Sequence, residues 1–278
     1  MSPLVFLIVL LGAALHATWN AIVKRGDNTL FTTVLVTGAA ALVAAIALPF
    51  LPQPAAASWP FITASTLLQL AYFTLVAQTY RITDMGLAYP LMRGTAPLLV
   101  SLASLVLLRE PLAPAAWIGI GIICVGILGM ALQARRDAPA LGLAMALLNA
   151  VVIAAYTLID GIGVRKSGAP AAYTLWIFLS TGFVLPAWAL LRHRAAFTSY
   201  IRRNWSLGLG GGIGTVVSYG LALWAMTTAP VAIVAALRET SILFGTVISG
   251  LVLHEKVSRV RIAGACLIVA GAIALRLA

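Results

Sequence analysis

Charged residues are scarce in this chain, and acidic residues are the scarcest. Only 9% of the 278 residues are charged, with 7 Asp and Glu against 18 Lys and Arg, whereas soluble domains carry roughly a quarter charged residues. There are only 3 His and 2 Cys, and both cysteines, Cys124 and Cys266, lie in apolar stretches. A clustered metal site and a disulfide framework are therefore not predicted, and we expect neither a metal nor a cofactor.

Apolar residues make up most of what is present: 62% of the chain is hydrophobic, and the mean hydropathy is +1.04. A transmembrane helix needs about 20 apolar residues to cross a hydrocarbon core roughly 30 Å thick. Polar residues divide the chain into ten such stretches, near 2–24, 29–51, 59–81, 84–108, 112–134, 139–161, 170–191, 206–226, 229–253 and 258–277. We expect an all-α integral membrane protein surrounded by the lipid bilayer, located in the inner (plasma) membrane, with its longest polar connection at Arg192–Asn204.

The net charge of +11 would suit nucleic-acid binding in a soluble protein, but here the cations gather at span ends, so no nucleic-acid partner is predicted. Lys and Arg near the cytoplasm are the usual bias of membrane proteins. Of the lysines and arginines at the span ends, four fall on the same side of the membrane as the N terminus and twelve fall on the other side. The four are Arg109, Arg165, Lys166 and Arg276, and the twelve are Lys24, Arg25, Arg81, Arg135, Arg136, Arg192, Arg194, Arg202, Arg203, Lys256, Arg259 and Arg261. This bias places both termini outside the cell.

Two segments separated by 145 residues (238 − 93) resemble one another. At this offset Arg93 matches Arg238, Glu110 matches Glu255, and Gly119 matches Gly264, which indicates an internal repeat. Each half holds five expected helices, an odd number, so the second half must enter the membrane from the opposite side. The sequence predicts a bundle of ten transmembrane helices built as a 5+5 inverted repeat, with repeats at 1–134 and 139–278. That architecture is common in secondary transporters.

The segments HATWNAIVK, LLREPLAPAAWIGIGIICVGI and LHEKVSRVRIAGACLIVAG, in this order and spacing, resemble the EamA-type members of the drug/metabolite transporter superfamily. The resemblance covers the whole chain. It implies a ten-helix carrier with a central cavity, often an exporter of amino acids or other small metabolites. Members of the family are commonly drawn with both termini in the cytoplasm, opposite to the orientation that the charge count favours. The resemblance names no substrate.

Arg93 and Arg238 each lie about nine residues into their spans, near the middle of the bilayer, where a charge must face a cavity or a partner. Arg93 has no acidic neighbour in its own segment, whereas Arg238 is followed by Glu239. A guanidinium matches a carboxylate through two parallel hydrogen bonds, so the arginines predict a small-molecule substrate with an anionic group. The alternative is structural: Arg238 and Glu239 form an ion pair, and Arg93 binds backbone carbonyls.

Other candidate binding residues are uncharged. Tyr89 shares a helix face with Arg93, while Trp19 and Tyr156 occupy matching places in the two halves and can form cavity walls or interfacial aromatic belts. Asn20 can bind substrate or join helices. His16 and Asp160 can relay protons or simply pack.

Glu110 and Glu255 precede the fifth and tenth expected helices, whose N termini they can cap. Gly119 and Gly126, like Gly264 and Gly271, lie seven residues apart and predict close helix packing or a homodimer contact. A membrane-embedded enzyme or a non-transporting scaffold stays open as an alternative class, but no catalytic residues are predicted, because the sequence shows no workable nucleophile and base.

Overall fold

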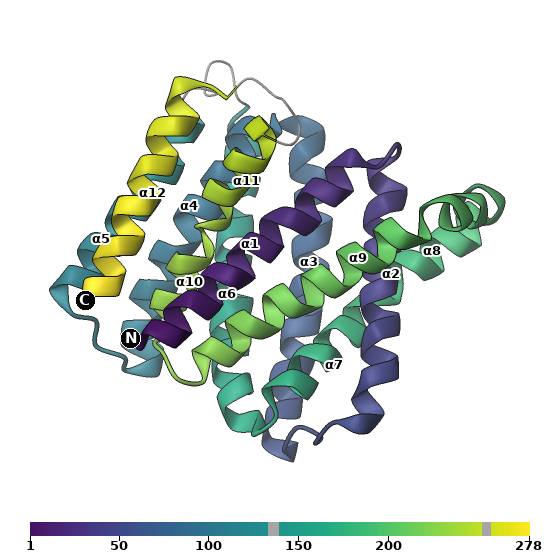
Figure 1. Ribbon diagram of the computed structural model, residues 1–278, viewed down its shortest axis with the longest axis horizontal. Coiled ribbons are helices and arrows are strands. Elements are labelled where there is room, and N and C mark those ends of the chain that lie inside the picture. Colours follow the sequence, from purple (N-terminus) through teal and green to yellow (C-terminus); the bar gives the residue numbers. More distant parts are fainter. Residues whose placement is uncertain (133–138, 252–256) are drawn as a thin grey trace.

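The computed structural model describes residues 1–132, 139–251 and 257–278, and the regular structure of this part of the chain is helical (Figure 1). The elements are α1 (Pro3–Arg25), α2 (Thr29–Ala47), η1 (Leu48–Phe50), η2 (Ala56–Ser58), α3 (Trp59–Ile82), α4 (Met85–Ala103), η3 (Ser104–Leu108), α5 (Pro114–Leu132), α6 (Ala140–Ser167), α7 (Pro170–Gly182), α8 (Val184–Arg192), α9 (Arg194–Met226), α10 (Val231–Arg238), α11 (Ser241–Leu251) and α12 (Arg259–Leu277). In the described part of the chain, ten segments are long and apolar enough to cross a membrane. The predicted all-α membrane fold with ten transmembrane spans is confirmed.

Short polar residues start several of these helices and explain why the expected spans end close to the observed ones. The Asn28 side chain accepts a hydrogen bond from Phe31 N (3.0 Å), Asp84 accepts one from Gly86 N (2.6 Å), and Ser258 accepts one from Arg261 N (3.3 Å). Each bond satisfies a backbone donor that a helix N terminus leaves free. Polar side chains at the membrane surface therefore fix where the apolar helices begin.

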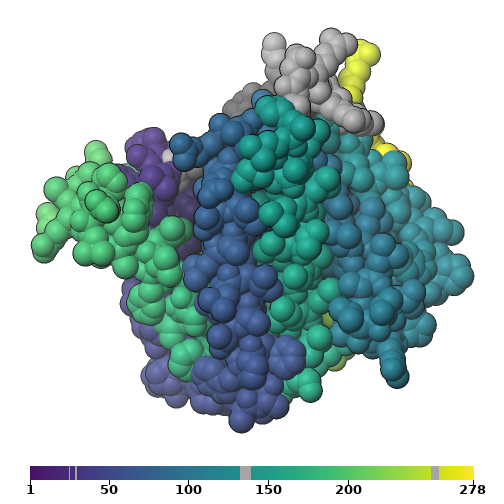
Figure 2. Space-filling view, turned by 180° about the vertical axis from the view of Figure 1, so that it is seen from behind, coloured from purple at the N-terminus to yellow at the C-terminus, as the bar shows by residue number. Residues whose placement is uncertain are grey.

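The expected polar connection at Arg192–Asn204 is wrong. α8 ends at Arg192 and α9 begins at Arg194, so this stretch is the first part of a 33-residue helix. Phe197 and Tyr200 are buried against the start of α2, where the Tyr200 hydroxyl lies 2.6 Å from the Thr32 hydroxyl. Figure 2 shows this green end of α9 projecting from the body of the molecule. Buried aromatic residues thus keep a strongly basic stretch helical.

The chain ends lie on one side of the bundle, together with the connections 51–58, 109–113, 167–169 and 227–230 (Figure 1). We call this the terminal side. Arg276 Nη1 donates to the carbonyl of Met1 across 3.4 Å there.

The helix pairs that pack together agree with an inverted repeat. α1 packs on α9 as α6 packs on α3, and α1 meets α10 and α11 as α6 meets α4. α2 with α7, and α5 with α12, pair across the middle. Of the expected repeat limits, residue 134 lies within 133–138, outside the described part of the chain, and residue 139 is the first described residue after this gap.

Glycines bring α5 and α12 into close contact. A Cβ atom at Gly126 would lie 2.9 Å from the Gly264 carbonyl oxygen, and one at Gly271 would lie 2.6 Å from that of Gly119. The two glycine pairs therefore let the backbones of α5 and α12 touch within one chain, as close packing requires. A homodimer stays a prediction.

Candidate functional site

The ninth membrane span is broken at its charged residues. α10 ends at Arg238 and α11 begins at Ser241, both inside the span Val231–Leu251. At the break Glu239 N donates to the Ala236 carbonyl (3.1 Å) and Thr240 N donates to the Leu237 carbonyl (3.0 Å). Each of these hydrogen bonds joins residues three apart, as in a 3-10 turn. A break at membrane depth is tolerated where it is enclosed by protein or lines a cavity. The span expected near 229–253 is found at Val231–Leu251, but its helix is interrupted, and the break places Arg238 and Glu239 at a helix end.

Prolines shape the facing helix, α4, around Arg93. Pro90 and Pro97 both lie inside α4. Because Pro97 has no N–H, the carbonyl of Arg93 loses its usual donor four residues further on. The Ser101 hydroxyl in turn donates to the Pro97 carbonyl across 2.7 Å. The backbone carbonyl of Arg93 therefore lacks its usual helical donor.

Arg93 and Glu239 form an ion pair that joins the two halves. The Nε atom of Arg93 lies 2.9 Å from Oε2 of Glu239, and the side chains are only 10% and 6% exposed. Neither of these two atoms makes a hydrogen bond within the described part of the chain, so the contact is electrostatic. Arg93 has no acidic neighbour in its own segment, but it finds an acidic partner in the opposite half, where no local sequence pattern reveals it.

Among the described residues Arg238 forms no ion pair with Glu239, its neighbour in sequence, and lies instead over an aromatic ring. Its guanidinium carbon lies 4.8 Å from the centre of the Tyr219 ring of α9, a distance at which a cation is attracted to the ring face. The alternative in which Arg238 and Glu239 pair with each other is wrong, because the acid pairs with Arg93. Arg93 thus pairs with an acidic residue, whereas Arg238 contacts an aromatic ring.

The two arginines and the acid line one cavity between the halves. The cavity has a volume of about 10 Å³, roughly the space of one water molecule. Its lining comes from α4, α6 and α10 with the following turn: Arg93, Ala96, Pro97, Val100, Ile153, Tyr156, Thr157, Ala235, Arg238 and Glu239. In this conformation the site is assembled but nearly filled by its own side chains. A larger groove, of about 600 Å³, follows the outer face of α9 from Arg194 to Arg203, away from these residues.

The remaining expected site residues differ in how close they lie to this cavity. Tyr156 lines it and meets Tyr72 of α3 edge to face, with ring centres 6.0 Å apart. Tyr89 is half-buried on α4 one turn from Arg93. Trp19 donates from Nε1 to His16 Nδ1 (3.3 Å), and Asn20 is exposed and donates to the His16 carbonyl (2.7 Å). The structure therefore brings together Arg93, Arg238, Glu239 and Tyr156, and leaves Trp19 and Asn20 outside the lining.

A second polar cluster lies between the cavity and the terminal side, around Asp160 of α6. Asp160 is fully buried and accepts hydrogen bonds from two phenols, Tyr173 Oη of α7 to Oδ1 (3.0 Å) and Tyr219 Oη of α9 to Oδ2 (2.5 Å). Asp160 and Tyr219 each lie seven residues before the terminal end of their helices (167 − 160 and 226 − 219). The sequence marked Asp160 but gave no sign of its tyrosine partners.

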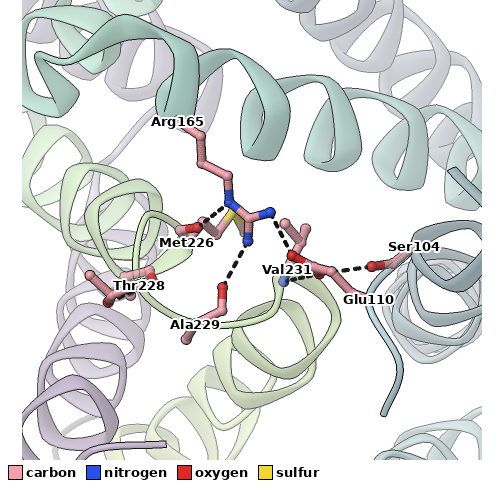
Figure 3. Close-up of polar contacts among 8 residues, drawn as sticks. Ser104, Glu110, Arg165, Met226, Thr228, Ala229 and Val231 are labelled. Atoms are coloured by element: carbon pink, nitrogen blue, oxygen red, sulfur yellow. Dashed lines mark hydrogen bonds and ion pairs between the residues drawn. The ribbon is translucent and has the colours of Figure 1, made fainter. Parts of the chain in front are cut away.

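A third cluster lies on the terminal side and is drawn in Figure 3. Arg165, near the end of α6, forms an ion pair with Glu110, and its guanidinium donates to the carbonyls of Met226 (2.7 Å) and Ala229 (3.0 Å). Glu110 also accepts from Val231 N across 3.0 Å, and from the Ser104 hydroxyl across 3.0 Å. The cluster therefore joins the first half to α6 and to the α9–α10 turn.

Glu110 is expected from the sequence to cap the helix that follows it, and this prediction names the wrong helix. The carboxylate does meet the start of a helix, but that helix is α10 of the other half and not α5, which follows Glu110 in sequence. Glu255, the matching residue, lies outside the described part of the chain. Within the described ranges no group of three metal-ligating side chains is found.

Comparisons with known proteins agree with this arrangement. The model of the EamA-like transporter family matches residues 3–132 and again residues 140–277. A crystal structure described only as that of a protein is similar in fold, with a TM-score of 0.75 and 21% sequence identity over 99% of this chain and 96% of the other. A search of curated protein sequences gave no match. With ten membrane spans, a broken helix at a charged cavity and a family match over both halves, the chain belongs to the EamA-like transporter family and is a multi-pass membrane transporter.

Proposed function

We propose that this transporter is a secondary carrier that exports small metabolites with an anionic group, such as amino acids or organic acids, across the cell's inner (plasma) membrane. The observation that carries the proposal is the cavity lined by Arg93 and Arg238 from opposite halves. A guanidinium binds a carboxylate through two parallel hydrogen bonds, and two guanidinium groups line this cavity together with a single acidic residue, Glu239. An incoming carboxylate can therefore replace Glu239 on Arg93 or add to Arg238.

Transport by alternating access fits the conformation observed. The cavity has room for about one water molecule, and the Glu110–Arg165 cluster joins the halves on the terminal side. A metabolite can enter only if the halves move apart, because the lining residues otherwise fill its place. In carriers built from inverted repeats, such a movement exposes a central site to each side in turn.

The test uses purified protein in liposomes loaded with a metabolite extract of the cell, and mass spectrometry of the compounds that leave. We expect one or a few compounds to leave faster than from protein-free liposomes, with saturable kinetics, and each to carry a carboxylate or another anionic group. Release of no compound would contradict the carrier function. Release of a compound without an anionic group would contradict the assignment of the arginines.

A further inference from the structure

We propose that Asp160 is a proton-binding site, and that a proton bound there accompanies the anionic substrate through the carrier. The second part of this inference, that the proton accompanies the substrate, rests on the proposed function. It starts from a difference between the buried acids. Glu239 lies against Arg93 and Glu110 against Arg165, whereas Asp160 accepts hydrogen bonds from two neutral phenols, and the described residues show no ion pair for it.

A buried carboxylate without a paired cation is the group that gains most from taking up a proton, because an uncompensated charge in hydrocarbon is costly. The groups that face Asp160 come from every side. Ser65 of α3, Tyr173 of α7 and Tyr219 of α9 are neutral, Tyr156 of α6 is a further phenol, and Arg238 at the end of α10 is the cation that acts on it. Arg238 is held on the ring of Tyr219.

Both protonation states have hydrogen-bond partners in this cluster. In the ionised state Tyr219 and Tyr173 each donate to one carboxylate oxygen. When a proton arrives from water, it binds Oδ2, and the new O–H donates to Oη of Tyr219, while Tyr173 continues to donate to Oδ1. The hydroxyl proton of Tyr219 then rotates away from Oδ2. The site therefore binds and releases one proton without leaving the carboxyl group unpaired.

Charge balance links this proton to the substrate cavity. Arg93, Arg238, Glu239 and ionised Asp160 sum to zero formal charge, and an added anion brings the sum to minus one. One proton on Asp160 restores neutrality. Tyr219 also connects the two sites, since its hydroxyl bonds Asp160 and its ring carries Arg238. Because coupling between two binding events is reciprocal, the anion favours the proton and the proton favours the anion. When the anion and the proton leave the cell together, the outward concentration gradient of the substrate supplies the free energy for export.

The first test needs no substrate. Infrared difference spectra between mildly acidic and mildly alkaline buffer should show a protonated-carboxyl band in the purified protein. Asp160→Asn should lack this band, while the double variant Arg93→Gln/Glu239→Gln, which removes the ion-paired acid, should keep it. A band that survives in Asp160→Asn, or one that is lost only in the double variant, would overturn the assignment of Asp160.

The second test uses the metabolite extract outside empty proteoliposomes, with the membrane potential clamped at zero. We expect acid outside to drive anions into liposomes that contain the wild-type protein, and Asp160→Asn to give the same uptake with and without the pH gradient. If the wild-type protein carries anions equally at both pH conditions, the proton inference is wrong and the carrier function stands. If no extract compound enters under either condition, the proposed function itself fails. If Asp160→Asn does not fold, the wild-type result still decides whether a proton accompanies the anion.

Discussion

Glu239 should be needed for stability only while Arg93 is present. Glu239→Gln removes the acid that lies 2.9 Å from the Arg93 guanidinium, at a site where both side chains are at most 10% exposed. Removing one partner of a buried pair leaves an uncompensated charge and costs about 3–5 kcal/mol, whereas replacing both partners by neutral groups is often close to neutral. The double variant Arg93→Gln/Glu239→Gln should therefore regain most of the stability that Glu239→Gln loses.

The assay is thermal unfolding of detergent-purified protein, followed by the monodisperse fraction after heating. Asp27→Asn, a change of an exposed acid, is the control and should shift the midpoint little, since exposed charges contribute little. The double variant should fold but transport no anion, because it lacks the binding guanidinium. Equal losses in the single and double variants would show that Arg93 and Glu239 do not stabilise one another, and anion transport by the double variant would assign the pair to structure alone.

Three further predictions concern other parts of the molecule. Arg165→Met removes the ion pair with Glu110 and two bonds to carbonyls. A thiol reagent added on the terminal side should therefore label the cavity variant Thr157→Cys several-fold faster when it also carries Arg165→Met; an unchanged rate would show that the cluster does not close that side. Gly126→Ala should cost about 1–3 kcal/mol by overpacking α5 on α12, while Gly121→Ala, which meets open space, should not; equal effects would contradict the close contact. A cysteine at Pro54 should react with an impermeant thiol reagent from outside intact cells, as the charge bias predicts, and labelling only after cell lysis would reverse the orientation.

The membrane spans could be predicted from the sequence because the bilayer imposes a length and an apolar composition on each helix. Capping residues such as Asn28 and Asp84 lie at the expected starts, so the limits of most spans follow from local signals. The N-terminal part of α9 escaped prediction because its basic residues look like a loop. The structure shows a helix there, and the burial of Phe197 and Tyr200 against α2, which supports it, is not visible in the sequence.

The candidate site could be predicted only in part, because charge in an apolar run is visible in a sequence but its partner is not. Arg93 and Arg238 stood out for their depth in the bilayer. The contact of Arg93 with Glu239 spans 146 positions (239 − 93) and the two halves. The break after Arg238 also lacks a proline or glycine signal at Glu239 and Thr240. Partners chosen by tertiary packing, such as Tyr219 for Asp160, lie beyond local patterns for the same reason.

The half-saturation concentration of Arg93→Ala tests the anion-binding role of the cavity most directly. The compounds are an acid identified by its release from liposomes and the amide of the same acid, each measured with the wild-type protein, Arg93→Lys and Arg93→Ala. Charge-assisted hydrogen bonds contribute about 1.5–3 kcal/mol each, so the affinity for the acid should fall roughly ten- to a hundredfold per bond lost. Arg93→Lys keeps the charge and should lose less, and the amide should be insensitive to both changes. An unchanged half-saturation for the acid in Arg93→Ala, or equal losses for acid and amide, would contradict the role of Arg93 in binding the anion.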